Sequence, residues 1–565
     1  MAEILTRCGR KELKCLNIMT VLLTTLNAKY IHTNLAIRLL YQLNKSYEGL
    51  AWREFTIKEN PDDIASICAS YHVVAFSCYI WNIRQTLIVC ERIKSLNPSV
   101  KIILGGPEVS YEYEPIIIQP YVDAIVVGEG EIPFRNFLIT GSEKQKGIVY
   151  KENNQINYIP NDTLFDLSEL ETINPYQDDD IESLKPRVLY VETSRGCPYK
   201  CEFCLASLDN KVRYLSTGRI KQNLLFLMQH GRTIKFLDRT FNVKKDFTIE
   251  VFKFILEHHS VGNIFQFEIT ADILHPDIIT FIREHVKYGL FRFEIGIQTV
   301  NQTANLAVSR KQNFQKTAAV IQAVRPYIEM HLDLIVGLPF DYWDDIKHSI
   351  EEVFSLYPPE LQLGFLKFLK GTPMRSKTAE HGYEYDAEAP YQIIRSHYLS
   401  NEELEKIETL EFALEVYWNK KRLVNTLMYI SSKDGVFDFL LGLGTYFKQM
   451  KNTLVYTLLD IYDVAHQYIE KYYADDKVMI QLFALDYYLQ YKIKPKVFVM
   501  QEPPKKEKFA WLDSQKLIHQ QYRYVVLDID FDWQYWMKSH QIKFNSQRVA
   551  IQYNGIQKAE MISIT

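Results

Sequence analysis

Short apolar runs alternate with amphipathic stretches over the first quarter of the chain. Four runs have the length and composition of buried strands: Thr20–Thr25, Val73–Ser77, Lys101–Leu104 and Ala124–Val127. Stretches with helical periodicity lie between them: Leu35–Gln42, Asp62–Ala69 and Ile83–Leu96. Buried strands that alternate with amphipathic helices form parallel sheets. The pattern therefore predicts an α/β fold with a doubly wound parallel sheet in this region.

A second series of strand-like runs begins at Val188. Its members are Val188–Thr193, Ile234–Leu237, Phe265–Thr270, Phe291–Gly296, Met330–Val336 and Gln362–Phe368. Helical periods lie between them, at Phe247–His259, Asp277–His285, Phe314–Val324 and Trp343–Leu356. Six such units within about 180 residues predict a partial or full parallel barrel. Chemistry in these barrels gathers at the carboxyl ends of the strands, where the polar residues of this region collect.

The other segments carry weaker patterns. Asn153-Asn154 predicts a hairpin, and the acidic run Asp178–Asp180 is typical of a short solvated loop. Past Gly371, Ser400 and Glu403 form a capping-box signature ahead of a long helical stretch. Alternation over Tyr524–Trp536 predicts a strand with one solvent-facing side.

These patterns divide the chain into five segments. Residues 1–18 are an N-terminal extension if translation starts at Met19, and residues 19–140 form the first α/β domain. A connector at 141–186 leads to the barrel at 187–375. Residues 380–565 then form a mainly helical C-terminal domain with a few strands.

The composition is that of a globular protein with balanced charge. The 565 residues include 65 Lys and Arg against 69 Asp and Glu, a formal charge of −4 at pH 7. This balance does not favour electrostatic binding to nucleic acid or to an anionic membrane through charge spread over the whole chain. No run approaches the roughly 20 apolar residues of a membrane span, and the N-terminus lacks a signal-peptide pattern. We therefore expect a cytoplasmic protein that binds neither membranes nor nucleic acid.

Glycines are scarce in this chain, and two clusters of them follow predicted strands. Gly105-Gly106 comes after Lys101–Leu104, and Gly128-Glu129-Gly130 comes after Ala124–Val127. Open α/β sheets bind ligands at such strand ends, although tight turns would also explain the glycines. No G-x-G-x-x-G motif is present at these positions, so a dinucleotide ligand is not favoured.

Three of the eight cysteines lie within eight residues, at Cys197, Cys201 and Cys204, and none follows them. In a cytoplasmic protein the cysteines are expected to be small buried apolar residues, metal ligands or catalytic groups rather than disulfide partners. A closed zinc site would need a fourth ligand, and the nearest downstream histidine, His230, is 26 residues away. Three thiolates suit an iron–sulfur cluster that keeps one iron open. Both kinds of site remain open from the spacing alone.

The segment Ser194–Cys204 resembles the cluster loop of the radical S-adenosylmethionine (SAM) superfamily. It carries that family's C-x3-C-x-aromatic-C pattern, with Phe203 at the aromatic position. The resemblance extends over about Val188–Met374 and implies a partial (β/α)6 TIM-like barrel. It also implies a 4Fe–4S cluster on Cys197, Cys201 and Cys204 with SAM bound at the open iron. One electron would then release methionine and a 5′-deoxyadenosyl radical.

Four further positions match parts of that family's cofactor site. Asp238 stands where the family places the segment that holds the methionyl amino group, although the common Gly-Gly-Glu is absent. Glu268 and Gln298 match polar residues near the cofactor, and Arg310 matches an arginine that binds the methionine carboxylate. The resemblance thus adds Asp238, Glu268, Gln298 and Arg310 to the expected cofactor-binding residues.

The first α/β domain resembles the cobalamin-binding domain that often precedes this barrel. The resemblance implies that Gly105, Gly106, Gly128, Glu129 and Gly130 face a bound cobalamin. The D-x-H-x-x-G signature, whose histidine ligates cobalt, is missing, and His32 is out of its register. We therefore expect cobalamin, if bound, to have no histidine ligand. The C-terminal region resembles a subgroup that carries a domain of unknown function.

Three functional hypotheses follow from these resemblances. The first is a cobalamin-dependent radical SAM enzyme, in such families most often a C-methyltransferase, reduced by a donor such as flavodoxin or ferredoxin. The second is a methylthiotransferase-like RNA-modifying enzyme, whose second cluster would need Cys68, Cys78 and Cys90. The third is a non-catalytic cobalamin or redox sensor. The substrate is not specified by the sequence, because the cofactor supplies the radical chemistry.

Overall fold

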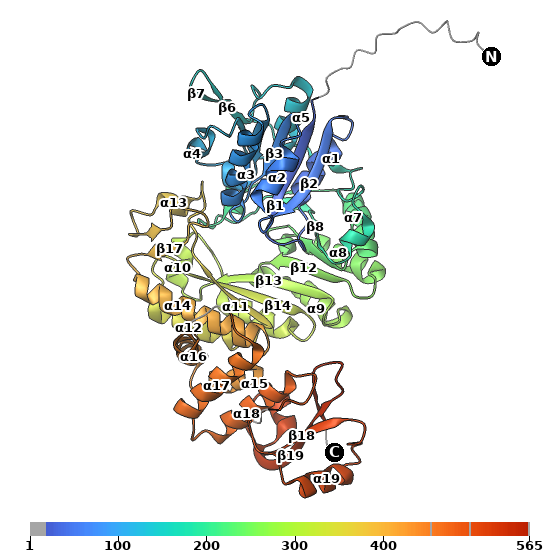
Figure 1. The fold of residues 1–565 in the computed structure, drawn as a ribbon, viewed down its shortest axis with the longest axis vertical. Helices are drawn as coiled ribbons and strands as arrows, with labels where there is room; N and C mark the ends of the chain where they lie inside the picture. The colour runs from blue at the N-terminus through green and yellow to red at the C-terminus, as the bar shows by residue number, and fades with distance from the viewer. Residues whose placement is uncertain (1–18, 452–454, 497–498, 563–565) are drawn as a thin grey trace, which may run out of the picture.

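The computed structural model describes residues 19–451, 455–496 and 499–562. Two α/β units and a C-terminal region follow one another along the long axis of the molecule (Figure 1). The extension expected at 1–18 lies outside the described residues. Among the helices of the described segments, none combines the length and apolar character needed to cross a bilayer.

The first sheet has seven strands in the order β2-β1-β3-β4-β5-β6-β7. They are β1 (Val21–Asn27), β2 (Leu50–Thr56), β3 (Val73–Ser77), β4 (Lys101–Gly105), β5 (Ala124–Val126), β6 (Ile148–Glu152) and β7 (Gln155–Tyr158). Strands β1 to β5 are parallel, and β6 and β7 are antiparallel.

Helices cover both faces of this sheet. One face packs against α1 (Leu35–Leu43) and α5 (Glu131–Thr140). The other packs against α2 (Pro61–Cys68), α3 (Ile83–Leu96) and α4 (Glu114–Ile117). The predicted doubly wound parallel sheet is confirmed, because buried apolar side chains on both faces need helices on both sides.

Two features of this sheet differ from the sequence-based expectation. Strand β2 was not predicted, because it is an edge strand in which Trp52, Arg53 and Glu54 break the apolar run. The hairpin at Asn153-Asn154 was predicted, and both residues have the positive φ that a tight hairpin requires. It is part of the sheet rather than of a connector, since β6 pairs with β5.

The second sheet has six parallel strands in the order β15-β14-β13-β12-β11-β8. They are β8 (Val188–Val191), β11 (Thr233–Phe236), β12 (Ile264–Ile269), β13 (Phe291–Gln298), β14 (Glu329–Val336) and β15 (Glu360–Phe365). The helices that follow these strands are α7 (Thr217–His230), α8 (Lys245–His258), α9 (Pro276–His285), α10 (Gln302–Ala307), α11 (Phe314–Val324) and α12 (Trp343–Phe354). All six predicted strands are present, and they form an open, partial barrel.

One face of the second sheet is apolar and the other is polar. Burial alternates strictly along β12, β13 and β14, with apolar residues packed beneath the helices. The half-buried residues between them are mostly polar or charged. This polar face looks toward the first domain (Figure 1), because Tyr190 on the same face of β8 shares a hydrogen bond with His32 at 2.8 Å.

The C-terminal region is mainly helical. Its helices are α14 (Asn401–Ala413), α15 (Val424–Lys433), α16 (Val436–Met450), α17 (Leu458–Tyr472), α18 (Lys477–Leu489), α19 (Lys505–Ser514) and α20 (Trp533–Ser539). The predicted capping box at Ser400 and Glu403 is present at the start of α14. An antiparallel sheet of β18 (Arg523–Phe531), β19 (Phe544–Tyr553) and β20 (Glu560–Ile562) completes the region.

The prediction for Tyr524–Trp536 is wrong in two respects. Strand β18 ends at Phe531, and Trp536 belongs to helix α20. Its expected solvent-facing side is partly covered, because Val526 packs with Leu512 of α19 in a small separate core.

Candidate active site

The cysteine loop begins directly after the first strand of the second sheet. A short ribbon of β9 (Ser194–Arg195) and β10 (Arg213–Tyr214) holds its base. Gly196 has φ +87°, and a Cβ there would lie 2.6 Å from the carbonyl oxygen of Lys211. Any other residue would therefore open the loop. The amide of Cys197 donates to the Asp209 carbonyl at 2.8 Å, which closes it.

The three thiols of this loop lie close enough to influence one another. Cys197 and Cys201 are buried, and Cys204 is half-buried. Burial raises the pKa of Cys197 and of Cys201, and the neighbouring thiols raise both further. The positive charge of a bound metal cluster would offset the repulsion between the thiolates and so favour loss of their protons.

The donor set of these thiols suits an iron–sulfur cluster. Three thiolates can each hold one iron of a cluster and leave a further iron open to a ligand. In the described part of the chain, no three His, Cys, Asp or Glu side chains are placed to hold one metal ion between them.

Arg310 connects the cysteine loop to the end of β13. Its Nη1 lies 3.6 Å from Sγ of Cys201, and its Nη2 donates to the carbonyl of Gly296 at 2.5 Å. Its Nε donates to Gln312 at 3.0 Å. The guanidinium opposes the effect of burial on the pKa of Cys201 by favouring the thiolate. The structure therefore brings Arg310 to the cysteines, next to the strand end where a ligand was expected.

Gln298 lies at the same strand end with an unused hydrogen-bond acceptor. A register shift separates Gly296 from Gln298, which has φ +70°. The side-chain amide of Gln298 occupies the space that a Cβ on Gly296 would need. Its Oε1 is buried and has no hydrogen-bond partner in the structure. A buried acceptor without a partner is costly, so this atom suits a ligand that donates a hydrogen bond.

Glu268 faces the same polar surface one strand away, on β12. Burial raises the pKa of Glu268, and the cations of Arg239 and Lys235 oppose that effect. The nearest of these contacts, from Arg239 Nη1 to Glu268 Oε1, is 3.8 Å. The carboxylate is therefore only loosely paired and is available to a ligand.

Asp238 and Phe203 have structural contacts. The carboxylate of Asp238 accepts from the Thr193 amide at 3.1 Å and from the Thr193 and Ser194 hydroxyls at 2.6 and 2.5 Å. Burial raises the pKa of Asp238 to about 6. Through these hydrogen bonds Asp238 fixes the end of β8, where the cysteine loop begins. Phe203 packs partly buried against the apolar core. Cofactor contacts of Asp238 and Phe203 remain predictions.

The two glycine clusters of the first domain lie side by side but differ in their surroundings. Gly106 has φ +105°, and its Cβ would lie 2.6 Å from the Cys78 carbonyl, so this glycine is required by the backbone. Ser110 joins the two clusters, because its hydroxyl donates to the Gly106 carbonyl and accepts from the Gly128 amide. Gly128 has no atom within 4 Å of its Cβ position. Open space for a cofactor therefore lies over Gly128 rather than over Gly106.

Gly105 and Gly130 are not tightly constrained, and Glu129 is engaged in ion pairs. A Cβ on Gly105 or Gly130 would make only ordinary contacts. Glu129 pairs with Arg195 at 3.1 Å and with Arg213 at 2.5 Å, and it accepts from the Phe165 amide. Arg195 and Arg213 form the base of the cysteine loop. Glu129 therefore ties the glycine end of the first sheet to that loop, a contact that the sequence did not predict.

Three aromatic residues missed by the sequence analysis lie between the two sheets. Tyr79 and Trp81 follow β3 and stack with their ring centroids 4.4 Å apart, and Trp81 is half exposed. Tyr190 of β8 hydrogen-bonds to His32 at 2.8 Å. Only their positions at strand ends could have suggested a role, because single aromatic residues are common in any core.

His32 has a structural partner, which leads to a testable prediction. Burial lowers its pKa, and its Nδ1 is shared with the Tyr190 hydroxyl. We expect the His32→Ala variant to retain as much cobalamin per chain as the wild type after gel filtration, measured by absorption. Gly128→Trp, which fills the open space, should lose cobalamin. Loss on His32→Ala would instead indicate that the ring ligates cobalt.

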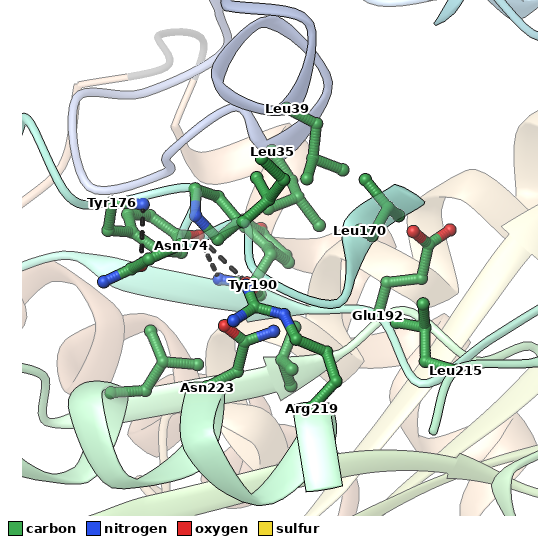
Figure 2. A pocket seen from close by; sticks show the side chains of 14 residues that line it. Leu35, Leu39, Leu170, Asn174, Tyr176, Tyr190, Glu192, Leu215, Arg219 and Asn223 are labelled. Carbon is green, nitrogen blue, oxygen red and sulfur yellow. Dashed lines mark hydrogen bonds between the residues drawn. The ribbon is translucent and has the colours of Figure 1, made fainter. Parts of the chain in front are cut away.

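A small apolar pocket lies outside the barrel, between α1 and α7 (Figure 2). Its walls come from Leu35 and Leu39, from the segment 170–176, from β8 and from α7. Arg219 extends toward it from α7 and is 5% exposed, and Asn223 presents a buried oxygen without a partner. The pocket lies beside the domain junction rather than at the cysteine loop.

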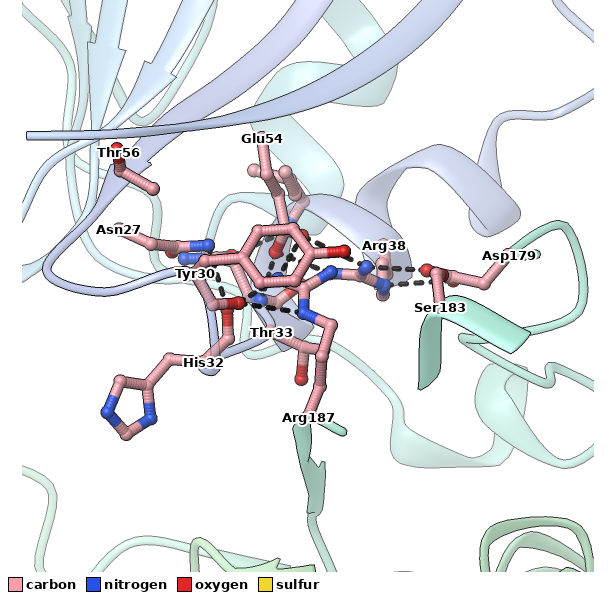
Figure 3. Close-up of polar contacts among 12 residues, drawn as sticks. Asn27, Tyr30, His32, Thr33, Arg38, Glu54, Thr56, Asp179, Ser183 and Arg187 are labelled. Atoms are coloured by element: carbon pink, nitrogen blue, oxygen red, sulfur yellow. Dashed lines mark hydrogen bonds and ion pairs between the residues drawn. The ribbon is translucent and has the colours of Figure 1, made fainter. Parts of the chain in front are cut away.

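A buried network of charges holds the two domains together (Figure 3). Arg38 of α1 pairs with Glu54 of β2 and with Asp179, each at 2.6 Å. Arg187, just before β8, pairs with the same Glu54 at 2.7 Å. The expectation that Asp178–Asp180 is a solvated loop is therefore wrong for Asp179, whose side chain is 4% exposed. Two arginines and two carboxylates balance each other, as burial of charge requires.

Family models match the three large regions of the chain. Residues 22–138 match the B12 binding domain, and residues 191–353 match the radical SAM superfamily. Residues 379–561 match a protein of unknown function, DUF4080. The order of these matches agrees with the sequence-based expectation.

Curated relatives match over a part of their length. An uncharacterized methyltransferase of Pyrococcus horikoshii is 30% identical over 204 residues, 34% of this chain and 44% of that protein. The cobalamin-dependent radical SAM methyltransferase TokK of Streptomyces tokunonensis is 31% identical over 181 residues, 28% of this chain and 26% of that protein. The chain thus spans less than half the length of these relatives.

Two solved structures share the fold at low sequence identity. The cobalamin-dependent SAM radical enzyme OxsB, with aqua-cobalamin and SAM bound, aligns with 88% of this chain and 75% of its own at a TM-score of 0.58 and 16% identity. The radical SAM methyltransferase TsrM from Kitasatospora setae aligns with 66% of this chain and 79% of its own, at a TM-score of 0.55 and 11% identity. The chain thus combines a B12-binding domain, a domain of the radical SAM superfamily and DUF4080, in this order.

Proposed function

We propose that this chain is a cobalamin-dependent radical SAM methyltransferase. Cys197, Cys201 and Cys204 would hold a 4Fe–4S cluster, and cobalamin would lie over Gly128 of the first domain. When bound, these groups supply the electron that cleaves SAM and a carrier for the methyl group. A flavodoxin or ferredoxin would deliver the electron.

The residues of this chain would bind and orient SAM beside the cluster. Arg310 offers a planar pair of donors next to Cys201, which suits the methionine carboxylate. Gln298 offers its buried acceptor to a donor group of the ligand, and Glu268 offers a loosely paired carboxylate. Glu268 and Gln298 come from the neighbouring strands β12 and β13, and Arg310 is bonded to Gly296 of β13, so the three side chains can contact one small molecule together.

One observation carries the proposal most directly. The base of the cysteine loop and the glycine end of the first sheet are joined through Glu129, Arg195 and Arg213. Arg195 also pairs with Glu131 at 2.7 Å and Glu192 at 2.8 Å. A methyl carrier on one domain and a cluster on the other would therefore face the same space at a fixed distance.

The alternative with a second cluster finds little support in the structure. Cys68, Cys78 and Cys90 are fully buried in the apolar core of the first domain. Burial raises the pKa of Cys68 to about 12 and also raises the pKa values of Cys78 and Cys90. Thiols in such surroundings are small apolar side chains rather than ready metal ligands.

Anaerobic reconstitution of the full chain tests the proposal. We expect about four irons and four sulfides per chain, as one 4Fe–4S cluster requires, and one bound cobalamin. Reduction with dithionite in the presence of SAM should produce 5′-deoxyadenosine. About eight irons would support the two-cluster enzyme, and cobalamin binding without 5′-deoxyadenosine under any reductant would support the sensor.

A further inference from the structure

The pocket beside the domain junction holds a buried cation without a partner. Arg219 is the third residue of α7, is 5% exposed and extends toward the pocket (Figure 2). Its guanidinium forms no ion pair or hydrogen bond with any residue that the structure describes. Burial lowers the pKa of Arg219 to about 10, and the charge of Glu171 opposes that effect only in part. Buried charges are ordinarily paired, so this arginine costs the fold stability unless a ligand compensates it.

A second unsatisfied group lies one turn further along the same helix. Asn223 follows Arg219 by four residues, so both side chains lie on one face of α7, and both line the pocket. The Oδ1 atom of Asn223 is buried and has no hydrogen-bond partner. The first turn of α7 has no acidic side chain, so the positive end of the helix adds to the charge of Arg219. The pocket therefore offers a cation and a free acceptor to the same ligand.

The rest of the pocket is suited to an apolar group. It encloses about 380 Å³ together with its open mouth, at the small end of the range for ligand pockets. Glu192 also lines it, but this carboxylate pairs with Arg195 at 2.8 Å and lies across the pocket from Arg219 (Figure 2). The apolar lining residues are mainly Leu35, Leu39, Leu170, Ile173, Leu215 and Leu227.

We infer that this pocket binds a small 2-hydroxy carboxylate with a short apolar chain. The planar guanidinium of Arg219 presents two parallel donors to the carboxylate. The hydroxyl group on the next carbon donates to Oδ1 of Asn223, and the chain packs against the leucines. A protonated amine would be repelled by Arg219. Inorganic phosphate would leave the apolar walls unused, so an organic acid fits the lining better.

The site is separate from the proposed SAM site, and the inference does not depend on the proposed function. Its walls come from both domains, with Leu35 and Leu39 on α1 of the first and with α7 and β8 of the second. A ligand in the pocket would contact both domains at once. Because it binds only the folded junction, it would raise the unfolding midpoint as its concentration rises.

Calorimetric titration of the full chain with 2-hydroxybutyrate tests the inference. We expect saturable binding, and no binding of 1-amino-2-butanol, in which a protonated amine replaces the carboxylate. Arg219→Met should raise the dissociation constant about tenfold or more, because the charge-assisted pair is lost. Without ligand, the unfolding midpoint of Arg219→Met should equal or exceed that of the wild type, because the variant no longer buries an unpaired cation.

Asn223→Leu keeps the charge and removes only the acceptor. It should raise the dissociation constant for 2-hydroxybutyrate about fivefold and leave that for butyrate, which has no hydroxyl, nearly unchanged. The matched control is Lys221→Met on the same helix, whose amine pairs with Glu250 at the surface and which should bind as the wild type does.

Three results would overturn the inference. The first is a wild type that does not bind 2-hydroxybutyrate, or that binds inorganic phosphate equally well. The second is an unchanged dissociation constant in Arg219→Met, which would place the ligand elsewhere, for example at Arg310. The third is a lower unfolding midpoint of ligand-free Arg219→Met, which would show that the arginine serves the fold rather than a ligand.

Discussion

Replacement of Cys197, Cys201 and Cys204 together by alanine is expected to abolish both iron binding and 5′-deoxyadenosine formation. Within this sequence no cysteine follows Cys204, so no later thiol can take the place of these ligands. Without these thiolates the cluster has no ligands from the protein. Iron should fall from about four per chain to none, and the absorption of the cluster should disappear.

The matched control is Cys90→Ala, which removes a thiol from the core of the first domain. It creates a small cavity but should leave iron content and 5′-deoxyadenosine formation unchanged. Iron retained by the triple variant would contradict the proposed ligand set. Iron lost in Cys90→Ala, with the fold intact by circular dichroism, would do so too.

Arg38→Met is expected to destabilise the protein strongly. Arg38 is 1% exposed and pairs with Glu54 and Asp179, so its removal leaves two buried carboxylates with one cation, Arg187. Breaking a buried ion pair from one side costs about 3–5 kcal/mol. Chemical denaturation should show a correspondingly lower midpoint. The matched control is Lys45→Met, whose partner Asp178 belongs to the same acidic run but is solvent-accessible. Equal midpoints for the two variants would contradict the role of the buried network.

The same network makes stability depend on pH in a defined direction. Burial raises the pKa of Glu54, but Arg38 and Arg187 outweigh that effect and leave the pKa below its usual value of 4.5. Glu54 thus contributes stability that is present above pH 4.5 and is lost as the pH falls through its lowered pKa. We expect Arg38→Met to flatten this acid limb of the stability profile. A limb as steep as that of the wild type would contradict the assignment to Glu54.

The predicted strands of both sheets were found because their signals are local. A strand such as Lys101–Gly105 buries both faces, so its apolar run is visible without knowledge of its neighbours. Strand β2 was missed because this edge strand has Arg53 and Glu54 within its run, and Glu54 belongs to the buried ion network. Strand β18 was placed too long, because alternation continues into α20, and only the cap formed by Asp532 ends it.

The candidate site was predictable in its parts but not in its connections. The spacing of the three cysteines predicted a metal site, and the resemblance placed Gln298, Glu268 and Arg310 near it. Burial and hydrogen bonding in the structure then distinguished residues that have structural partners from residues that are available to a ligand. Asp238 is occupied by Thr193 and Ser194, whereas Gln298 keeps a free acceptor. The positive φ of Gly106 likewise reflects the backbone of Cys78 rather than a ligand.

By itself, the sequence predicted most strands and helices of the two α/β units, although not the edge strand β2, and a metal site at the three cysteines. Periodicity, glycine placement and cysteine spacing are properties of neighbouring residues, so they can be read without the fold. Only the tertiary structure decided that Glu129 holds the cysteine loop and that Asp179 is buried with Arg38. These contacts join residues far apart in the chain, and the free energy of burying each charge depends on which partners the fold brings to it.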